Sequence, residues 1–531
     1  MMTKFAVHDW NFYIQESLMR PLLFAALLAA IGTSAQAALP EPIAKLAAER
    51  GIPEEAIGAV VLRGDQVLVS HEATRTFTPA SVMKLFTTMV GLDVLGPQFR
   101  GRTELRTTGT VVDGVLHGDL VLRGGADGDF TADVFTHMLE KLRTKGIRKI
   151  DGNLLLDRQL WQPARADAGA PPFDESPEAY YNLIPDALLL NMNLQTLDIT
   201  SDAKSIKASA LPELDNVRVR SELTLVDRDC AKWEEGWKIP EYVRNGSHLT
   251  VVLKGTFPRN CSKTNVINVL DRTDYAERLF RATWERLGGH FNGQAFEVSA
   301  EQSRAFNSGA STLLAEHVSR SLPEMVRDTN KLSDNGLART IFLSLGSLQA
   351  DPALGSIPLP DTAPMEIPGG AEAAPAPMTT NARSEMVIRN WLRAHGIDDS
   401  GMVFENGAGL SRIERFSPEQ MAGLLKAAQK SLWAPEFLTS LPIASIDGTM
   451  KRRLKESPAA MRARVKTGSL KNVVAVAGYV PDANGQQCIV VVMVNHDRAG
   501  NGNGRALTDG VIDWVARSTA AEPVVAPPNA H

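Results

Sequence analysis

The chain has 531 residues, of which 44% are hydrophobic and 22% charged, and its formal net charge at pH 7 is −5. This composition is typical of a globular protein and excludes a disordered, fibrous or polytopic membrane chain. The slightly acidic balance does not favour a nucleic-acid or anionic-membrane partner. At roughly 150 residues per domain, the length predicts about three or four domains.

The N-terminus has the pattern of an export signal. Residues 21–31 form an apolar run that is too short to span a bilayer but suits the core of a signal peptide. Residues 35–37, Ala-Gln-Ala, fit a cleavage site, so a signal peptide is predicted over 1–37 and a mature chain from Ala38. We expect translation to begin at Met19, because the preceding residues lack signal-peptide features. The mature protein is therefore predicted to be soluble and exported.

Three cysteines are too few for a disulfide scaffold. Export would place them in an oxidising compartment, where Cys230 and Cys261 are expected to form a disulfide. The alternative is that all three, Cys488 included, are reduced and buried.

In chain order, apolar runs at 57–62 and 66–70 flank Arg63-Gly64-Asp65 and predict a β-hairpin. A helical pattern of apolar residues follows from 83 to 95. Residues 191–264 are rich in strand-like runs, and residues 351–381 are rich in Pro, Ala and Gly, which predicts a flexible surface loop. Further helices are predicted over 130–145, 275–287, 325–346 (broken at 333–336), 385–394, 418–428 and 510–517, and terminal strands over 464–466, 473–480 and 488–494.

Ser81 and Lys84 form a Ser-x-x-Lys motif at the start of the first predicted helix. Positions i and i+3 of a helix share a face, so the lysine can reach the serine hydroxyl. A serine needs a base to become a nucleophile, and a desolvated lysine with a lowered pKa can serve. The motif alone is weak evidence. A second copy at 201–204 lies in a polar, strand-like stretch with no helix after it, and is interpreted as a chance match.

Two further motifs follow along the chain. Residues 333–335 read Ser-Asp-Asn, which alone would indicate only a turn or helix cap, and residues 466–469 read Lys-Thr-Gly-Ser, which alone would indicate a strand end before a turn. A strand edge at the second motif can pair with a substrate backbone. The backbone N–H groups of Ser81 and Ser469 can face a developing oxyanion.

The order Ser-x-x-Lys, Ser-x-Asn, Lys-Thr-Gly resembles the motif set of the penicillin-interacting serine enzymes. Ser81 and Ser333 are 252 positions apart, several times the spacing in compact relatives, which indicates inserted domains. The chain thus resembles the low-molecular-mass class C penicillin-binding proteins, the D-alanyl-D-alanine carboxypeptidase/endopeptidase family. Segments 180–182, 187–191, 406–412 and 441–444 with 447–449 also resemble that family. Arg339 departs from it, because the family usually has an acidic residue there, and the 351–381 loop is longer than usual.

The resemblance implies an α/β (α+β) fold. Its core is a penicillin-binding/serine β-lactamase-like transpeptidase domain, an antiparallel sheet flanked by helices, with two nested, mostly β inserted domains. The expected division is signal peptide 1–37, catalytic domain 38–97 and 300–518, inserted domain II 98–190 and 265–299, inserted domain III 191–264, and a disordered tail 519–531.

The resemblance also implies roles for the motif residues. Ser81 would attack the substrate carbonyl with Lys84 as the favoured base, although the identity of the base stays open. Ser333 would relay a proton to the leaving amine with Lys466 nearby, and Asn335 would position the substrate amide. The carboxylate would be bound by Thr467, Gly468 and Ser469. The expected reactions are hydrolysis of D-Ala–D-Ala and D-Ala–diaminopimelate bonds of peptidoglycan.

In related enzymes an acidic residue near the Tyr180-Tyr181 segment is thought to meet the free amino end of the stem peptide. Asp174 and Glu175 are the candidates, and the alternative is a solvated acidic loop.

Peptidoglycan stems, cross-links and β-lactams are the expected partners, in the periplasm, with loose association to the cell envelope left open. No cofactor or metal is expected, because the histidines show no ligand spacing. Two other functions remain open: a non-catalytic peptidoglycan-binding or scaffolding protein on this fold, and a β-lactamase, although no fast deacylating base is evident in the sequence.

Overall fold

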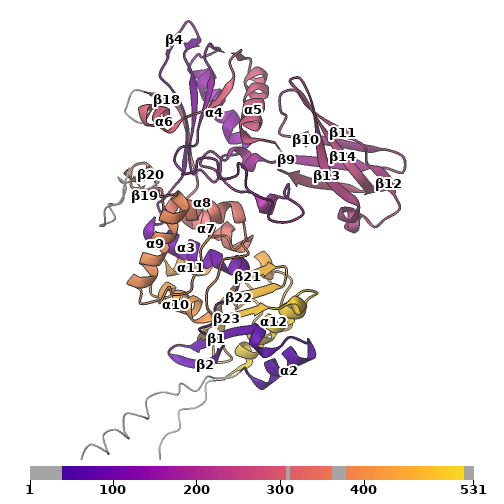
Figure 1. The fold of residues 1–531 in the computed structure, drawn as a ribbon, viewed down its shortest axis with the longest axis vertical. Coiled ribbons are helices and arrows are strands. Elements are labelled where there is room, and N and C mark those ends of the chain that lie inside the picture. The colour runs from indigo at the N-terminus through magenta and orange to yellow at the C-terminus, as the bar shows by residue number, and fades with distance from the viewer. Residues whose placement is uncertain (1–38, 269, 307–310, 361–377, 520–531) are drawn as a thin grey trace, which may run out of the picture.

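The structure is a computed structural model that describes residues 39–268, 270–306, 311–360 and 378–519. The predicted signal peptide and nearly all of the predicted C-terminal tail lie outside the described residues. In Figure 1 the chain forms three bodies: in the lower half the domain that was expected to be catalytic, called the catalytic domain below, an α/β domain above it and an all-β domain beside that one.

A five-stranded antiparallel sheet in the order β2-β1-β23-β22-β21 forms the centre of the catalytic domain. It joins the predicted N-terminal hairpin to the three predicted terminal strands, so both ends of the chain build one sheet. The strands are β1 (Ile57–Arg63), β2 (Gln66–His71), β21 (Arg464–Leu470), β22 (Val473–Pro481) and β23 (Gln487–Asn495).

Both faces of this sheet are buried, which explains the nearly continuous apolar runs of β22 and β23. On one face Val476 and Val490 pack in a core shared with α2 and α12. On the other face Ala477 and Val491 pack in a core shared with the remaining helices. The helices are α2 (Glu41–Glu49), α3 (Lys84–Val94), α7 (Leu322–Lys331), α8 (Asn335–Leu345), α9 (Thr380–Ala394), α10 (Pro418–Ala428), α11 (Ala434–Ser440) and α12 (Asn503–Arg517).

The inserted α/β domain has a five-stranded sheet in the order β17-β8-β6-β3-β18, packed with helices α4 and α5. A separate four-stranded sheet of short strands has the order β16-β7-β5-β4. The elements are β3 (Arg102–Thr107), β4 (Thr110–Val112), β5 (Val115–His117), β6 (Leu120–Gly125), α4 (Ala132–Thr144), β7 (Lys149–Ile150), β8 (Leu154–Asp157), α5 (Arg272–Arg286), β16 (His290–Phe291), β17 (Ala295–Glu297), α6 (Ala300–Ala305) and β18 (Thr312–Val318).

One expected boundary differs from the sheet topology. Strand β18 pairs with β3 along Thr312–Val318, so the inserted sheet continues past residue 299, where the catalytic domain was expected to resume. The two strands are about 200 positions apart, and local periodicity does not reveal which distant strand a segment will join. The chain returns to the catalytic domain at α7.

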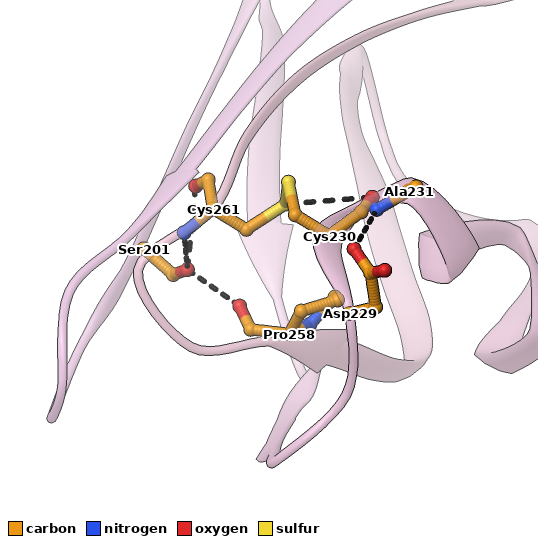
Figure 2. Close-up of a disulfide and its surroundings, with 6 residues drawn as sticks. All are labelled: Ser201, Asp229, Cys230, Ala231, Pro258 and Cys261. Carbon is orange, nitrogen blue, oxygen red and sulfur yellow. Dashed lines mark hydrogen bonds between the residues drawn. A yellow bond between two sulfur atoms is a disulfide. The ribbon is translucent and has the colours of Figure 1, made fainter.

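The all-β domain has two sheets, β10-β9-β15 and a four-stranded sheet in which β14 pairs with β11, β12 and β13. The structure joins Cys230 and Cys261 in the expected disulfide at this domain's core (Figure 2), and Ser201 Oγ binds the Pro258 carbonyl beside it. This Ser201 belongs to the second Ser-x-x-Lys copy and has a structural role. The strands are β9 (Gln195–Ser201), β10 (Ile206–Leu211), β11 (Val217–Ser221), β12 (Thr224–Val226), β13 (Trp237–Asn245), β14 (His248–Pro258) and β15 (Ser262–Ile267).

The expected flexible loop at 351–381 is only partly described. Its first residues belong to a hairpin of β19 (Leu348–Asp351) and β20 (Gly355–Pro358), and its last ones begin α9 at Thr380. Residues 361–377 lie outside the described residues. Among the described helices, none is both long and apolar enough to cross a membrane.

Candidate active site

Ser81 lies in a 3-10 turn, Ala80–Met83, that leads directly into α3. Asn495 at the end of β23 fixes the approach to this turn, because its side chain accepts from the Thr78 N–H (2.8 Å) and donates to the Thr78 carbonyl (3.1 Å). Ala80 has a φ of 47°, a left-handed conformation that is strained for a residue with a Cβ. Such strain is concentrated at functional sites.

Lys84 begins α3, is fully buried, and its Nζ donates to three oxygen atoms. These are Ser81 Oγ at 3.1 Å, Asn335 Oδ1 at 2.6 Å and the Ala408 carbonyl. Burial is the main cause that lowers the pKa of Lys84 to about 7; the negative charges of Asp334 and Glu414 oppose this shift, and the positive charge of Arg339 adds to it. The amine therefore exchanges its proton near neutral pH while it contacts the serine hydroxyl.

Ser333 and Asn335 are presented by the start of α8. The Asp334 side chain caps this helix by accepting from the Leu337 N–H at 2.8 Å. Ser333 has a φ of 61°, a second strained position at the site. Asn335 Nδ2 donates to the Tyr181 carbonyl at 2.8 Å, so the asparagine links Lys84 to the loop that joins β8 of the α/β domain to β9 of the all-β domain. Tyr180 donates to the Asp334 carboxylate from the same loop.

Lys466 on β21 completes the centre. Its Nζ is fully buried and donates to Ser333 Oγ at 2.8 Å and to the Thr467 carbonyl at 2.8 Å. Burial, and after it the nearby positive charge of Lys84, lowers the pKa of Lys466 well below its usual value. The two lysines thus each contact one serine, and the charge of Lys84 disfavours that of Lys466.

The remainder of the Lys-Thr-Gly-Ser strand passes close to the nucleophile. A Cβ at Gly468 would lie 2.8 Å from the Pro79 carbonyl and 3.0 Å from Ser81 N, which explains why glycine stands there. Thr467 Oγ1 donates to Thr449 Oγ1 at 2.7 Å. Ser469 is exposed at the outer end of the strand.

The acidic candidates of the inserted loop differ in their surroundings. Asp174 accepts from the Ser176 N–H (3.0 Å), Tyr181 OH (3.0 Å) and Asn182 Nδ2 (2.7 Å). Burial raises the pKa of Asp174, but these hydrogen bonds and the positive charge of Arg412 outweigh it and lower the pKa overall. Glu175 is exposed and, within the described part of the chain, has no side-chain hydrogen bond or ion pair.

Glu414 is a site residue that sequence reasoning missed. It is fully buried, and Oε1 accepts from the N–H groups of Glu405, Asn406 and Gly407 at 2.9–3.1 Å. This cradle holds the loop whose next carbonyl, at Ala408, accepts from Lys84. Burial raises the pKa of Glu414. No local sequence signal separates a buried loop-organising glutamate from a solvated one.

The fold and this arrangement of two serines, two lysines and an asparagine define a penicillin-interacting serine enzyme. The sequence matches the D-Ala-D-Ala carboxypeptidase 3 (S13) family over residues 39–355 and 370–517, and the chain belongs to that family. It is therefore a serine-type D-Ala-D-Ala carboxypeptidase by class.

Curated relatives and a solved structure agree with this assignment. The chain is 24% identical to the D-alanyl-D-alanine carboxypeptidase DacB of Haemophilus influenzae over 81% of this chain and 83% of the relative. It is 25% identical to the D-alanyl-D-alanine carboxypeptidase of an Actinomadura species over 81% of this chain and 75% of the relative. The crystal structure of penicillin-binding protein 4 from Haemophilus influenzae has the same fold, with a TM-score of 0.69, 20% identity, and coverage of 90% of this chain and 99% of that one.

Proposed function

We propose that the protein is a serine D,D-peptidase that hydrolyses D-Ala–D-Ala and D-Ala–diaminopimelate bonds of peptidoglycan through an acyl-enzyme on Ser81. One observation carries the assignment of roles: Lys84 Nζ contacts both Ser81 Oγ and Asn335 Oδ1 while it is fully buried. A base of this kind needs contact with the nucleophile and a pKa near the working pH, and Lys84 has both.

Acylation begins when neutral Lys84 takes the hydroxyl proton of Ser81. The serine Oγ then bonds to the carbonyl carbon of the D-Ala residue, and the carbonyl oxygen becomes an oxyanion. The N–H groups of Ser81 and Ser469 are the donors for this charge, in keeping with the close approach of β21 to the Ser81 turn. Asn335 fixes the substrate amide beside the new bond.

Release of the amine uses the second serine. Ser333 Oγ–H donates its proton to the leaving nitrogen as the C–N bond breaks, and Lys466 Nζ, which contacts Ser333 Oγ, supplies a proton in return. Thr467, Gly468 and Ser469 bind the carboxylate on the leaving side. Water then attacks the ester, gives a proton to Lys466, and Lys84 returns a proton to Ser81. All groups are restored, and the acyl peptide leaves as a carboxylic acid that gives its remaining proton to the solvent and becomes a carboxylate.

Recognition of the acyl side is assigned to the inserted loop. Asp174 keeps its negative charge under the influence of its hydrogen-bond donors and Arg412, so it can attract the free amino end of the stem peptide. Its link to the centre runs through Tyr181, whose hydroxyl binds Asp174 and whose carbonyl binds Asn335. Glu175 has no such link, and Asp174 is the better supported of the two.

The Cys230–Cys261 disulfide supports export of the protein to an oxidising compartment, for which we propose the periplasm. Disulfides persist there and are rare in the cytosol.

Release of D-alanine from a peptide ending in D-Ala–D-Ala tests the activity. The full mature chain should release D-alanine, and Ser81→Ala should release none. An intact Ser81 with no D-alanine release would favour the non-catalytic scaffolding function. Rapid destruction of penicillin by the protein would favour a β-lactamase.

A further inference from the structure

A concentrated positive surface follows the site residue Thr449. Residues 451–464 include six arginines and lysines and one acidic residue, Glu456, whereas the whole chain has a net charge of −5. This local excess of positive charge is opposite in sign to the net charge of the whole chain.

The backbone of this segment is fixed. Arg453 Nη2 binds Asp509 Oδ1 at 2.7 Å and Thr508 Oγ1 at 3.0 Å, which ties the segment to α12. Met450 and Ala459 are fully buried in the core that α12 shares with the sheet. Arg453 therefore serves the fold, and its neighbours are presented on a rigid support.

Lys451, Arg452 and Lys455 are exposed and, across the described ranges of the chain, have no ion-pair or side-chain hydrogen-bond partner. Holding like charges close together without counter-charges costs free energy, which an acidic ligand would offset. The missing counter-charges concern only these three exposed side chains, because Arg453, which lies between Arg452 and Lys455, is paired with Asp509.

Lys451 and Arg464 are close along the chain to the residues that would hold the leaving group under the proposed function. Lys451 follows Thr449, which binds Thr467 of the carboxylate-binding strand, by two residues. Arg464 lies two residues before Lys466 on β21, and alternate residues of a strand share a face. Lys331, two residues before Ser333, pairs with Asp447 at 2.7 Å.

The positive charges near the site also affect Lys331. Its pKa is lowered first by burial and then by the charges of Arg327 and Arg464, in spite of the ion pair with Asp447. Tyr181, in the loop that the proposed function assigns to the acyl side, accepts a hydrogen bond from the Asn335 amide nitrogen instead of contacting these cations. Lys451 and Arg464 are therefore placed on the side of the site that the departing amine would occupy under the proposed function.

We propose that Lys451, Arg452 and Arg464 form a binding site for the acidic peptide attached to the leaving amine, that is, the amine-side stem of a cross-link. The proposal rests on the proposed function, because that function defines which side the leaving group occupies. A stem peptide carries several carboxylates beyond the scissile bond, whereas a single leaving D-alanine carries one, already bound by Thr467 and Ser469. The site would therefore favour cross-links over unlinked peptides.

Two substrates and two double variants test this site. The substrates are a purified cross-linked muropeptide dimer and a monomeric peptide ending in D-Ala–D-Ala. The test variant is Lys451→Ala/Arg452→Ala, and the matched control is Lys204→Ala/Lys207→Ala, which removes two exposed lysines from the all-β domain.

The test variant should lower kcat/KM for the dimer about fivefold to tenfold and leave the monomer within about twofold of wild type, and the control should change neither. Added salt should lower the wild-type dimer rate toward that of the variant. Equal losses on both substrates, or no loss on the dimer, would overturn the proposal. Failure of the proposed function would give a different result from failure of this binding site, because the wild-type protein would then cleave neither substrate.

Discussion

Lys84 Nζ lies 2.6 Å from Asn335 Oδ1, although 251 positions separate the two residues. This contact decides how the neutral amine is oriented. A neutral amine has two protons, and the Asn335 and Ala408 oxygen atoms accept them, because neither oxygen has a proton to give. The lone pair of the nitrogen is then directed at Ser81 Oγ, as a general base requires.

Acylation should therefore depend on pH through Lys84. The active form is the neutral amine, and burial lowers the pKa of Lys84 to about 7. The acylation rate constant should rise about tenfold per pH unit below pH 7 and level off above it. Stopped-flow acylation by a chromogenic β-lactam between pH 5 and pH 9 measures this. A limb that is flat, or that keeps rising to pH 10, contradicts the assignment of Lys84 as the base.

Arg339 should influence the same rise of the acylation rate with pH. Its positive charge lowers the pKa of Lys84, so Arg339→Gln should move the limb to higher pH. At pH 6 the acylation rate should fall roughly twofold to tenfold, and at pH 9 it should change little.

Arg339 also donates to the Leu183 carbonyl at 2.7 Å, and Arg339→Lys separates the two effects because it keeps the charge. The lysine variant should keep the limb of wild type. If both variants lose the same activity at every pH, the contact with Leu183 matters and the electrostatic explanation is wrong.

Gly468→Ala should slow acylation on the order of a hundredfold, because the added methyl would displace β21 from the Ser81 turn. The matched control is Gly500→Ala, where a Cβ meets no atom within 4 Å and φ is −63°. Acylation kinetics of the two variants, with circular dichroism to verify folding, make the comparison. Wild-type acylation by Gly468→Ala would show that the close approach has no function.

The Cys230–Cys261 disulfide closes a loop of 31 positions in the all-β domain. Replacing both cysteines with serine should lower the free energy of unfolding by roughly 3–4 kcal/mol in the chain-entropy model. Urea denaturation measures the change, and acylation at 25 °C should stay near wild type because the catalytic residues belong to other sheets and helices. Unchanged stability would mean that the loop is already ordered in the unfolded state.

The main part of the site was predictable because three motifs in a fixed order carry it. Ser81, Lys84 and Lys466 are placed by local rules: a helix start for the first two and a strand of the terminal sheet for the third. The disulfide was predictable from the number and spacing of the cysteines together with the predicted export signal.

Other features depend on distant contacts that no local pattern encodes. Glu414 acts through three backbone N–H groups of a loop, and β18 joins the inserted sheet by pairing with β3. The Tyr181 carbonyl became part of the site through a hydrogen bond from Asn335, which a sequence motif cannot show. These are long-range relationships, and the sequence periodicity reports only the face that each element buries.

The covalent adduct with penicillin tests the central claim most directly. Intact mass spectrometry of the mature protein after incubation with penicillin should show one added penicillin that persists for minutes, mapped by peptide mass to Ser81. The Ser81→Ala variant should show none. No adduct on the wild-type protein, or an adduct that survives in Ser81→Ala, would contradict the account.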